Sequence, residues 1–138
     1  MKVKILLCIL LALGVLIISC QNDESIEFKR YYTSGSLVYQ SHCQNCHGSQ
    51  GEGLKGLIPP LSDTSFMRSN LTRLPCIIKN GLKGKIEIDH RSFEGEMAKI
   101  DLNPMELAQV ITYVNNSFGN QLGMTGYEEV ITDLNTCR

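Results

Sequence analysis

The sequence predicts one small domain of the all-α class, and three observations support this. The chain has 138 residues, which suits a single hydrophobic core. A short helix is expected over 75–80, with Gly81 as its C-cap. The only extended piece expected is a brief one around Ile86 and Ile88, so we expect no sheet of consequence. Near the C-terminus, apolar residues recur at the three- and four-residue steps of an amphipathic helix: Leu107, Val110, Ile111 and Val114.

The charge balance excludes one class of partner. Thirteen Lys and Arg residues stand against fourteen Asp and Glu residues, for a formal net charge of −1. Such a chain has no positive field to hold a phosphate backbone, so we expect no nucleic-acid binding. Six cysteines are too few for a disulfide-dense scaffold, and each therefore needs its own interpretation.

The first residues resemble an export signal. Two lysines precede an apolar run over 5–18, which is shorter than the roughly 20 residues a membrane-spanning helix needs. The run leads into Ile-Ile-Ser-Cys at 17–20, which resembles the lipobox of bacterial lipoproteins. That resemblance implies that residues 1–19 are a signal peptide and that Cys20 carries lipid. The alternatives are an uncleaved anchor and a plain signal sequence with an incidental cysteine.

A lipid on Cys20 would tether the protein to a membrane surface without spanning it. Residues 20–32 then form an acylated, solvated spacer, because charged side chains outnumber apolar ones over most of it. The folded domain with its C-terminal tail is expected over 33–138. We expect the protein on the periplasmic side of a bacterial membrane, or at the cell surface.

A motif at residues 43–47 predicts a covalently bound porphyrin. Cys43 and Cys46 are three residues apart and His47 follows, so one helical turn can direct both sulfurs and the imidazole at one planar ligand. Two thiols at this spacing add to the vinyl groups of haem, and the histidine supplies the proximal ligand to the iron. We therefore expect one covalent haem c, with His47 as a metal ligand.

Three other interpretations of this motif are weaker. A zinc half-site would need two more ligands, and no second Cys-x-x-Cys or closely spaced His pair follows. A redox-active dithiol of the thioredoxin kind would need alternating strands and helices, whereas 48–61 is a loop rich in glycine and proline. A structural disulfide is the third alternative. The export signal favours haem.

Residues 33–120 resemble the class I cytochromes c, which are small monohaem electron carriers. The resemblance implies a fold in which the first and last helices cross, with short middle helices and loops around one haem. Gly35 and Tyr39 match the glycine and the aromatic residue of the family's first helix at that crossing. Tyr113 matches an aromatic residue that packs there from the last helix.

The resemblance also assigns the loop after the motif, where residues 58–61 read Ile-Pro-Pro-Leu. In the family this loop lies on the histidine side of the ring. It implies that the carbonyl of Pro59 accepts the free N–H of His47, which orients the imidazole and makes it a more basic ligand. It also implies that Leu61 presses on the haem face.

Met97 is the expected sixth ligand. Residues 97–110 resemble the family's ligand loop, which leads from the axial methionine into the last helix, and a thioether there completes His/Met coordination. Ala98 departs from the family, which usually has proline after this methionine. The alternatives are His90, which we expect in an exposed turn, Met67, and an open site.

Local signals set the start of the last helix. Asn103 is its expected N-cap, Pro104 its first residue and Glu106 the capping partner. Met105 then lies in the first turn, where we expect it to pack. Asparagines and a glycine over 115–119 end the helix.

Cys8 lies within the expected signal peptide, so Cys76 and Cys137 remain. In an exported protein an even remainder is more simply read as a disulfide than as two free thiols. Such a bridge would fasten the tail after Gly119 onto the middle helix and stabilise the fold by about 4 kcal/mol. The alternative is a buried Cys76 with a free thiol at the terminus.

A haem with two protein ligands has no vacant position for a substrate, so its chemistry is the transfer of one electron. We expect a monomeric, non-enzymatic carrier that makes small, transient contacts with redox protein partners and shuttles between respiratory donors and acceptors. One alternative is a fixed haem subunit of a dehydrogenase or oxidase complex. Another is a haem sensor or peroxidase in which Met97 is labile because Ala98 replaces proline.

Overall fold

The computed structural model describes residues 3–5, 9 and 22–137. Most of the expected signal peptide lies outside the described residues, and so does Cys20. A unit with its own core begins at Tyr31, two residues before the expected start of the domain. Among the described residues, no helix combines the length and apolar character that a membrane span requires.

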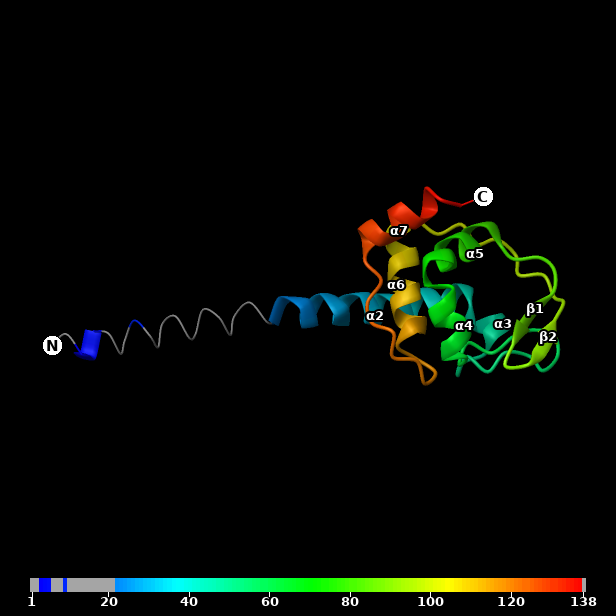
Figure 1. Cartoon of the computed structure of the whole chain (residues 1–138), viewed down its shortest axis with the longest axis horizontal. Coiled ribbons are helices and arrows are strands. Elements are labelled where there is room, and N and C mark those ends of the chain that lie inside the picture. The colour runs from blue at the N-terminus through cyan, green and yellow to red at the C-terminus, as the bar shows by residue number, and fades with distance from the viewer. Residues whose placement is uncertain (1–2, 6–8, 10–21, 138) are drawn as a thin grey trace. The chain divides into compact units, whose positions relative to one another are not determined.

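The described elements are mainly helices, and one small sheet accompanies them (Figure 1). In chain order they are α2 (Asn22–His42), α3 (Gln44–His47), α4 (Thr64–Ser69), η1 (Leu71–Arg73), α5 (Leu74–Asn80), β1 (Ile86–Ile88), β2 (Arg91–Phe93), α6 (Pro104–Asn115) and α7 (Tyr127–Leu134).

The sheet departs from the expected all-α class. β1 and β2 pair antiparallel, with Ile86 opposite Phe93. Asp89 and His90 connect them, with φ values of 50° and 56°. Two positive φ angles in succession suit a tight hairpin turn, which lets a strand pair form from very few residues. The brief extended piece expected around Ile86 is confirmed, and His90 lies in an exposed turn.

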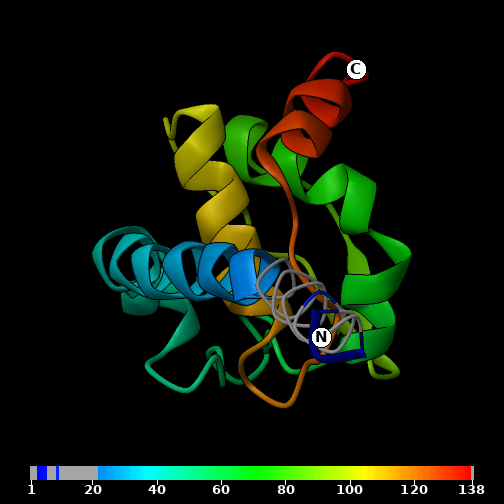
Figure 2. The ribbon, with the colours of Figure 1, turned by 90° about the vertical axis from the view of Figure 1, so that its left-hand side faces the viewer.

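Gly35 marks the crossing of α2 and α6, which Figure 2 shows. A Cβ atom on Gly35 would stand 2.6 Å from the carbonyl carbon of Gln109 and 2.9 Å from the Cβ of Tyr113. The two backbones can approach this closely only because glycine has no side chain. The predicted close crossing at Gly35 is therefore confirmed, although α6 is followed by one further helix, α7.

Helix α6 supplies much of the core. Its apolar stripe is buried as predicted: Leu107, Val110, Ile111 and Val114. The capping box is also present, because Asn103 Oδ1 accepts from the backbone N–H of Glu106 at 3.0 Å and Glu106 Oε2 accepts from that of Asn103 at 2.9 Å. Met105, however, is 38% exposed, so the expectation that it packs in the interior is wrong.

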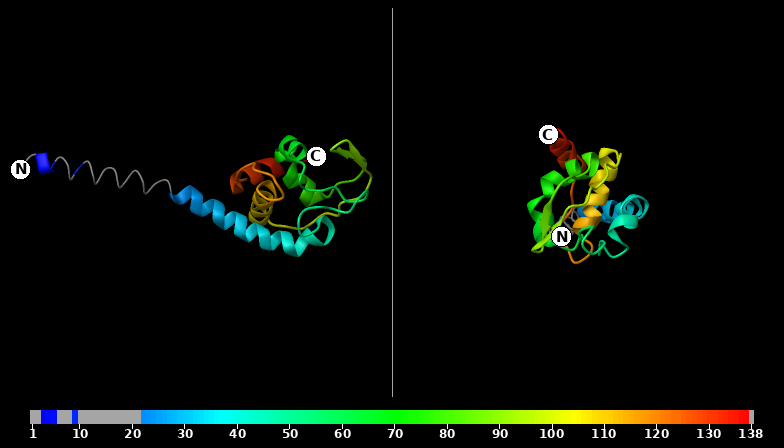
Figure 3. Two further views of the ribbon diagram at one scale, coloured as in Figure 1. Left: turned by 90° about the horizontal axis from the view of Figure 1, so that it is seen from below. Right: turned by 90° about the vertical axis from the view of Figure 1, so that its right-hand side faces the viewer.

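The C-terminal tail contains a helix that the sequence analysis did not predict. α7 packs against α5 and α6 and buries Val130 completely (Figure 3). Cys76 on α5 and Cys137, just after α7, form a disulfide with their Cα atoms 5.5 Å apart. The tail is therefore an ordered part of the domain, fastened to the middle helix.

Candidate functional site

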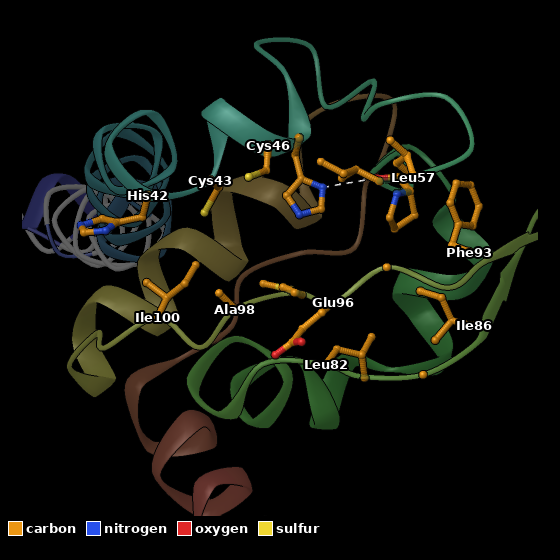
Figure 4. A pocket seen from close by; sticks show the side chains of 16 residues that line it. His42, Cys43, Cys46, Leu57, Leu82, Ile86, Phe93, Glu96, Ala98 and Ile100 are labelled. Carbon is orange, nitrogen blue, oxygen red and sulfur yellow. Dashed lines mark hydrogen bonds between the residues drawn. The ribbon is translucent and has the colours of Figure 1, made fainter.

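The motif at 43–47 forms a helical turn directly after α2. The backbone N–H of Cys43 donates to Tyr39 at 2.8 Å, and that of His47 donates to Cys43 at 2.9 Å. This turn aligns both thiols with the imidazole along one cavity. Figure 4 shows Cys43 and Cys46 on one side of the cavity, with Leu82, Glu96 and Ala98 across from them.

The cavity is one part of a larger cleft. A volume of about 260 Å³ adjoins a second volume of about 100 Å³, and the two share six lining residues. Those six are Cys43, His47, Pro59, Leu82, Ile86 and Met97. Apolar side chains dominate the walls, and this combination of an apolar cleft with a few convergent polar groups is typical of a cofactor site.

His47 is oriented within this cleft. Its Nδ1 lies 3.3 Å from the carbonyl oxygen of Pro59, shown as the dashed line in Figure 4. Burial lowers the pKa of His47, and the hydrogen bond to Pro59 opposes that effect. A carbonyl oxygen can only accept, so Nδ1 carries the proton and Nε2 keeps a lone pair. A neutral imidazole held in this way suits a metal ligand.

The thiol of Cys43 differs from the reactive thiol of a redox-active dithiol. Burial raises the pKa of Cys43 to about 11, and the neighbouring Cys46 adds to the effect. Redox-active Cys-x-x-Cys sites instead depend on a lowered thiol pKa. Within the described part of the chain, no group of three or more His, Cys, Asp or Glu side chains is placed to hold a metal ion. The raised pKa of Cys43 therefore weakens the dithiol alternative.

Met97 lines both parts of the cleft and is half-buried. Its backbone pairs with Leu82: the N–H of Met97 donates to Leu82 at 2.9 Å, and the N–H of Leu82 donates back at 3.0 Å. The main chain on each side of the Met97 side chain is thus held in place.

The two alternative ligands lie elsewhere or are otherwise engaged. His90 is exposed and lines a separate polar hollow beside Asp63 and Arg91, not the cleft. Met67 does line the inner part of the cleft, but it is only 5% exposed and belongs to the hydrophobic core. Of the three candidate side chains, Met97 is the one that faces both parts of the cleft.

Several residues of the cleft carry no sequence signal of their own. Leu61 lines the inner part, and Ile86 belongs to the extended piece that the sequence predicts. Leu82, however, reaches the cleft through backbone pairing with Met97, and Glu96 lines its outer part next to Met97. His42 is exposed and lines the outer part. The sequence predicts a solvated side chain on a different helix face from Cys43; His42 is exposed, but it lines the same part of the cleft as Cys43.

The donor set and the walls fit a haem. The two thiols at the attachment spacing and the imidazole of His47 share a wall, and the thioether of Met97 borders the same apolar cleft. The fold and the cleft together define a mainly helical, haem-binding domain.

Comparison with known proteins agrees. Residues 32–118 match the model of the family described as "Cytochrome c". Two relatives named cytochrome c-552, both from Thermus thermophilus and the second from a particular strain of it, are each 25% identical over 99 residues. Each match covers 68% of this chain, with 75% of the first relative and 66% of the second. The chain belongs to the cytochrome c family, and as a single-domain member it binds one covalent haem c.

Proposed function

We propose that the protein is a one-electron carrier in which Cys43 and Cys46 attach the haem and His47 and Met97 ligate its iron. The observation that carries the proposal is that all four side chains line one apolar cleft. The haem supplies reversible uptake and release of a single electron.

The residues of the cleft have separate tasks in this proposal. The carbonyl of Pro59 holds the imidazole of His47 in one orientation, so the ligand need not reorganise when the charge on the iron changes. Leu61, Ile86 and their apolar neighbours keep water away from the ring. Cys46 and Leu57 are exposed at the rim, Leu57 to 62%, and mark the side at which a redox partner would approach.

The labile-ligand alternative receives less support from the structure. Ala98 lacks the fixed φ angle that proline would give the loop. The two hydrogen bonds between Met97 and Leu82 nevertheless fix the backbone at the ligand itself. A held sixth ligand favours a carrier over a sensor or a peroxidase, since both of those need a vacant coordination position.

Absorption spectra of Met97→Ala test the ligand assignment. We expect this variant to lose the weak red charge-transfer band typical of iron–methionine bonds, and its reduced form to bind carbon monoxide rapidly. His90→Ala and Met67→Leu serve as controls and should keep the parent spectrum. An unchanged Met97→Ala spectrum would contradict the assignment.

We also propose that lipid on Cys20 keeps the carrier at a membrane surface, where it meets its redox partners transiently on the same face. The lipobox-like sequence at 17–20 supports this. In cell fractionation, the parent should enter the membrane fraction without spanning it, and Cys20→Ser should move to the soluble fraction. Identical distribution of the two proteins would count against the tether.

A further inference from the structure

We propose that α7 and the Cys76–Cys137 disulfide act as a clamp that positions the sixth ligand. We call residues 96–100 the Met97 loop. In this proposal the clamp fixes the position of α5, and α5 together with Gly81 and Leu82 fixes the position of the Met97 loop. The inference rests on the proposed function, because it takes Met97 to be an iron ligand.

The first link joins the Met97 loop to the end of α5. Besides the two hydrogen bonds between Met97 and Leu82, the N–H of Ile100 donates to the carbonyl of Ile78 at 3.0 Å. Lys83 and Glu96 add an ion pair at 2.9 Å, but both side chains are largely exposed, so its contribution is small. Three backbone hydrogen bonds therefore determine where the loop lies.

Gly81 makes this contact close. Its φ is +78°, and a Cβ atom there would lie 2.5 Å from the carbonyl oxygen of Met97 and 2.9 Å from the backbone nitrogen of Lys99. The loop thus lies directly on the residue that ends α5. Because these backbones are in direct contact, a displacement of α5 would also displace Met97.

The second link joins α5 to α7. α5 has only seven residues, and so short a helix is not stable without tertiary contacts. Those contacts include α6 and α7, and the disulfide ties Cys76 on α5 to Cys137, three residues after the end of α7. α7 is itself anchored by the buried side chain of Val130.

The third observation is that the Met97 loop contains no proline, whose ring would fix a φ angle within the loop itself. Ala98 is exposed and stands where the resemblance to class I cytochromes c leads us to expect proline. α7 and Cys137 lie beyond residues 32–118, which match the family model. We infer that this C-terminal addition restrains the loop from outside.

Hydrogen–deuterium exchange of the haem-loaded protein tests the clamp. The variant carries Cys76→Ser and Cys137→Ser, which leave the haem motif intact. We expect the amides of Leu82, Met97 and Ile100 to exchange roughly tenfold faster or more than in the parent, because local opening of the loop becomes easier. Carbon monoxide binding to the reduced protein should accelerate in parallel.

The controls separate a local effect from a general loss of stability. The amides of Gly53 and Leu61 are hydrogen-bonded at 2.8 Å on the histidine side of the cleft and should keep their parent rates. Thr132→Ala, on an exposed face of α7, should leave all of these rates unchanged. Equal acceleration at the control amides, or no acceleration at the loop, overturns the clamp.

A second measurement covers the case in which the double variant does not fold. A dithiol reductant added to the folded parent converts the disulfide to two thiols and is itself oxidised to a disulfide, whereas thioether links to haem do not react. The loop amides should respond as in the variant, and failure to do so overturns the clamp.

The spectrum of Met97→Ala distinguishes the two proposals. An altered spectrum together with parent-like loop exchange in the disulfide variant rejects the clamp alone. An unaltered spectrum rejects the ligand assignment, and the clamp with it.

Discussion

Gly35 and Tyr39 determine where the haem motif lies relative to α6. Tyr39 is 1% exposed, and its hydroxyl donates to the carbonyl of Gly48 at 2.6 Å. Its ring packs against Tyr113 and Phe118, with centroids 5.4 and 5.3 Å away. Burial raises the pKa of Tyr39, so the hydroxyl stays protonated and keeps donating. One side chain thus ties the end of α2 both to α6 and to the first residue after the motif.

Gly35→Ala should destabilise the protein despite the better helix propensity of alanine. The change would gain about 1 kcal/mol in an exposed helix, but here the new methyl group meets the backbone of Gln109, which cannot move without separating the helices. We expect a net loss of about 1–3 kcal/mol in the free energy of unfolding, measured by denaturant titration. Gln40→Ala, exposed on the same helix, is the matched control. Stability equal to the parent in Gly35→Ala would mean that the crossing is looser than described.

At the residue scale, the sequence predicted the features that depend on near neighbours. Cys43, Cys46 and His47 are recognisable because their chemistry depends on spacing within one turn. Leu82 is not, since it reaches the cleft through backbone pairing with Met97, which lies in a different segment of the chain. The roles of Pro59 and Met97 could be predicted from the sequence, but only through its resemblance to a known family.

The helices also separate into those that local sequence patterns predict and those that depend on contacts with distant residues. α6 was predictable because its apolar stripe and its capping box are local patterns. α7 has eight residues and begins at Tyr127, and the residue before it, Gly126, has no side chain to cap the helix, so packing and the disulfide account for its position. α4 did carry a usable signal, since Asp63 accepts from the backbone N–H of Phe66 at 2.9 Å, and the sequence analysis missed it.

Asp133→Asn should stabilise α7 in a pH-dependent way. Partial burial raises the pKa of Asp133 above its ordinary 3.8, and Glu129, one turn earlier, adds to the effect by repulsion. The folded state therefore binds this proton more tightly than the unfolded state does. The charged carboxylate costs stability above its folded-state pKa, and this cost disappears well below 3.8.

Thermal unfolding at two pH values measures this effect. At neutral pH we expect Asp133→Asn to gain about 0.2–0.5 kcal/mol, the usual size of a like-charge pair one helical turn apart. In strong acid, where Asp133 is protonated in both states, the gain should vanish. A gain of the same size at both pH values would show that charge is not the cause.

On the scale of the whole domain, the cleft has two walls that come from different parts of the chain. The haem motif and the loop after it form one wall, and the end of α5, the β1–β2 hairpin and the Met97 loop form the other. α6 contributes Val110, Ile111 and Val114 to the inner end. This arrangement places the proposed ligands His47 and Met97 on separate segments of the chain. The packing of the whole domain must therefore hold these two segments at a fixed distance from each other.

The central claim is that a haem is covalently attached through Cys43 and Cys46, and the mass of the denatured protein tests it most directly. Protein from a bacterial host that matures c-type cytochromes should carry the mass of one haem, with haem absorbance accompanying the unfolded chain. A variant with Cys43→Ala and Cys46→Ala should lack both signals. A parent chain without the added mass would contradict the account.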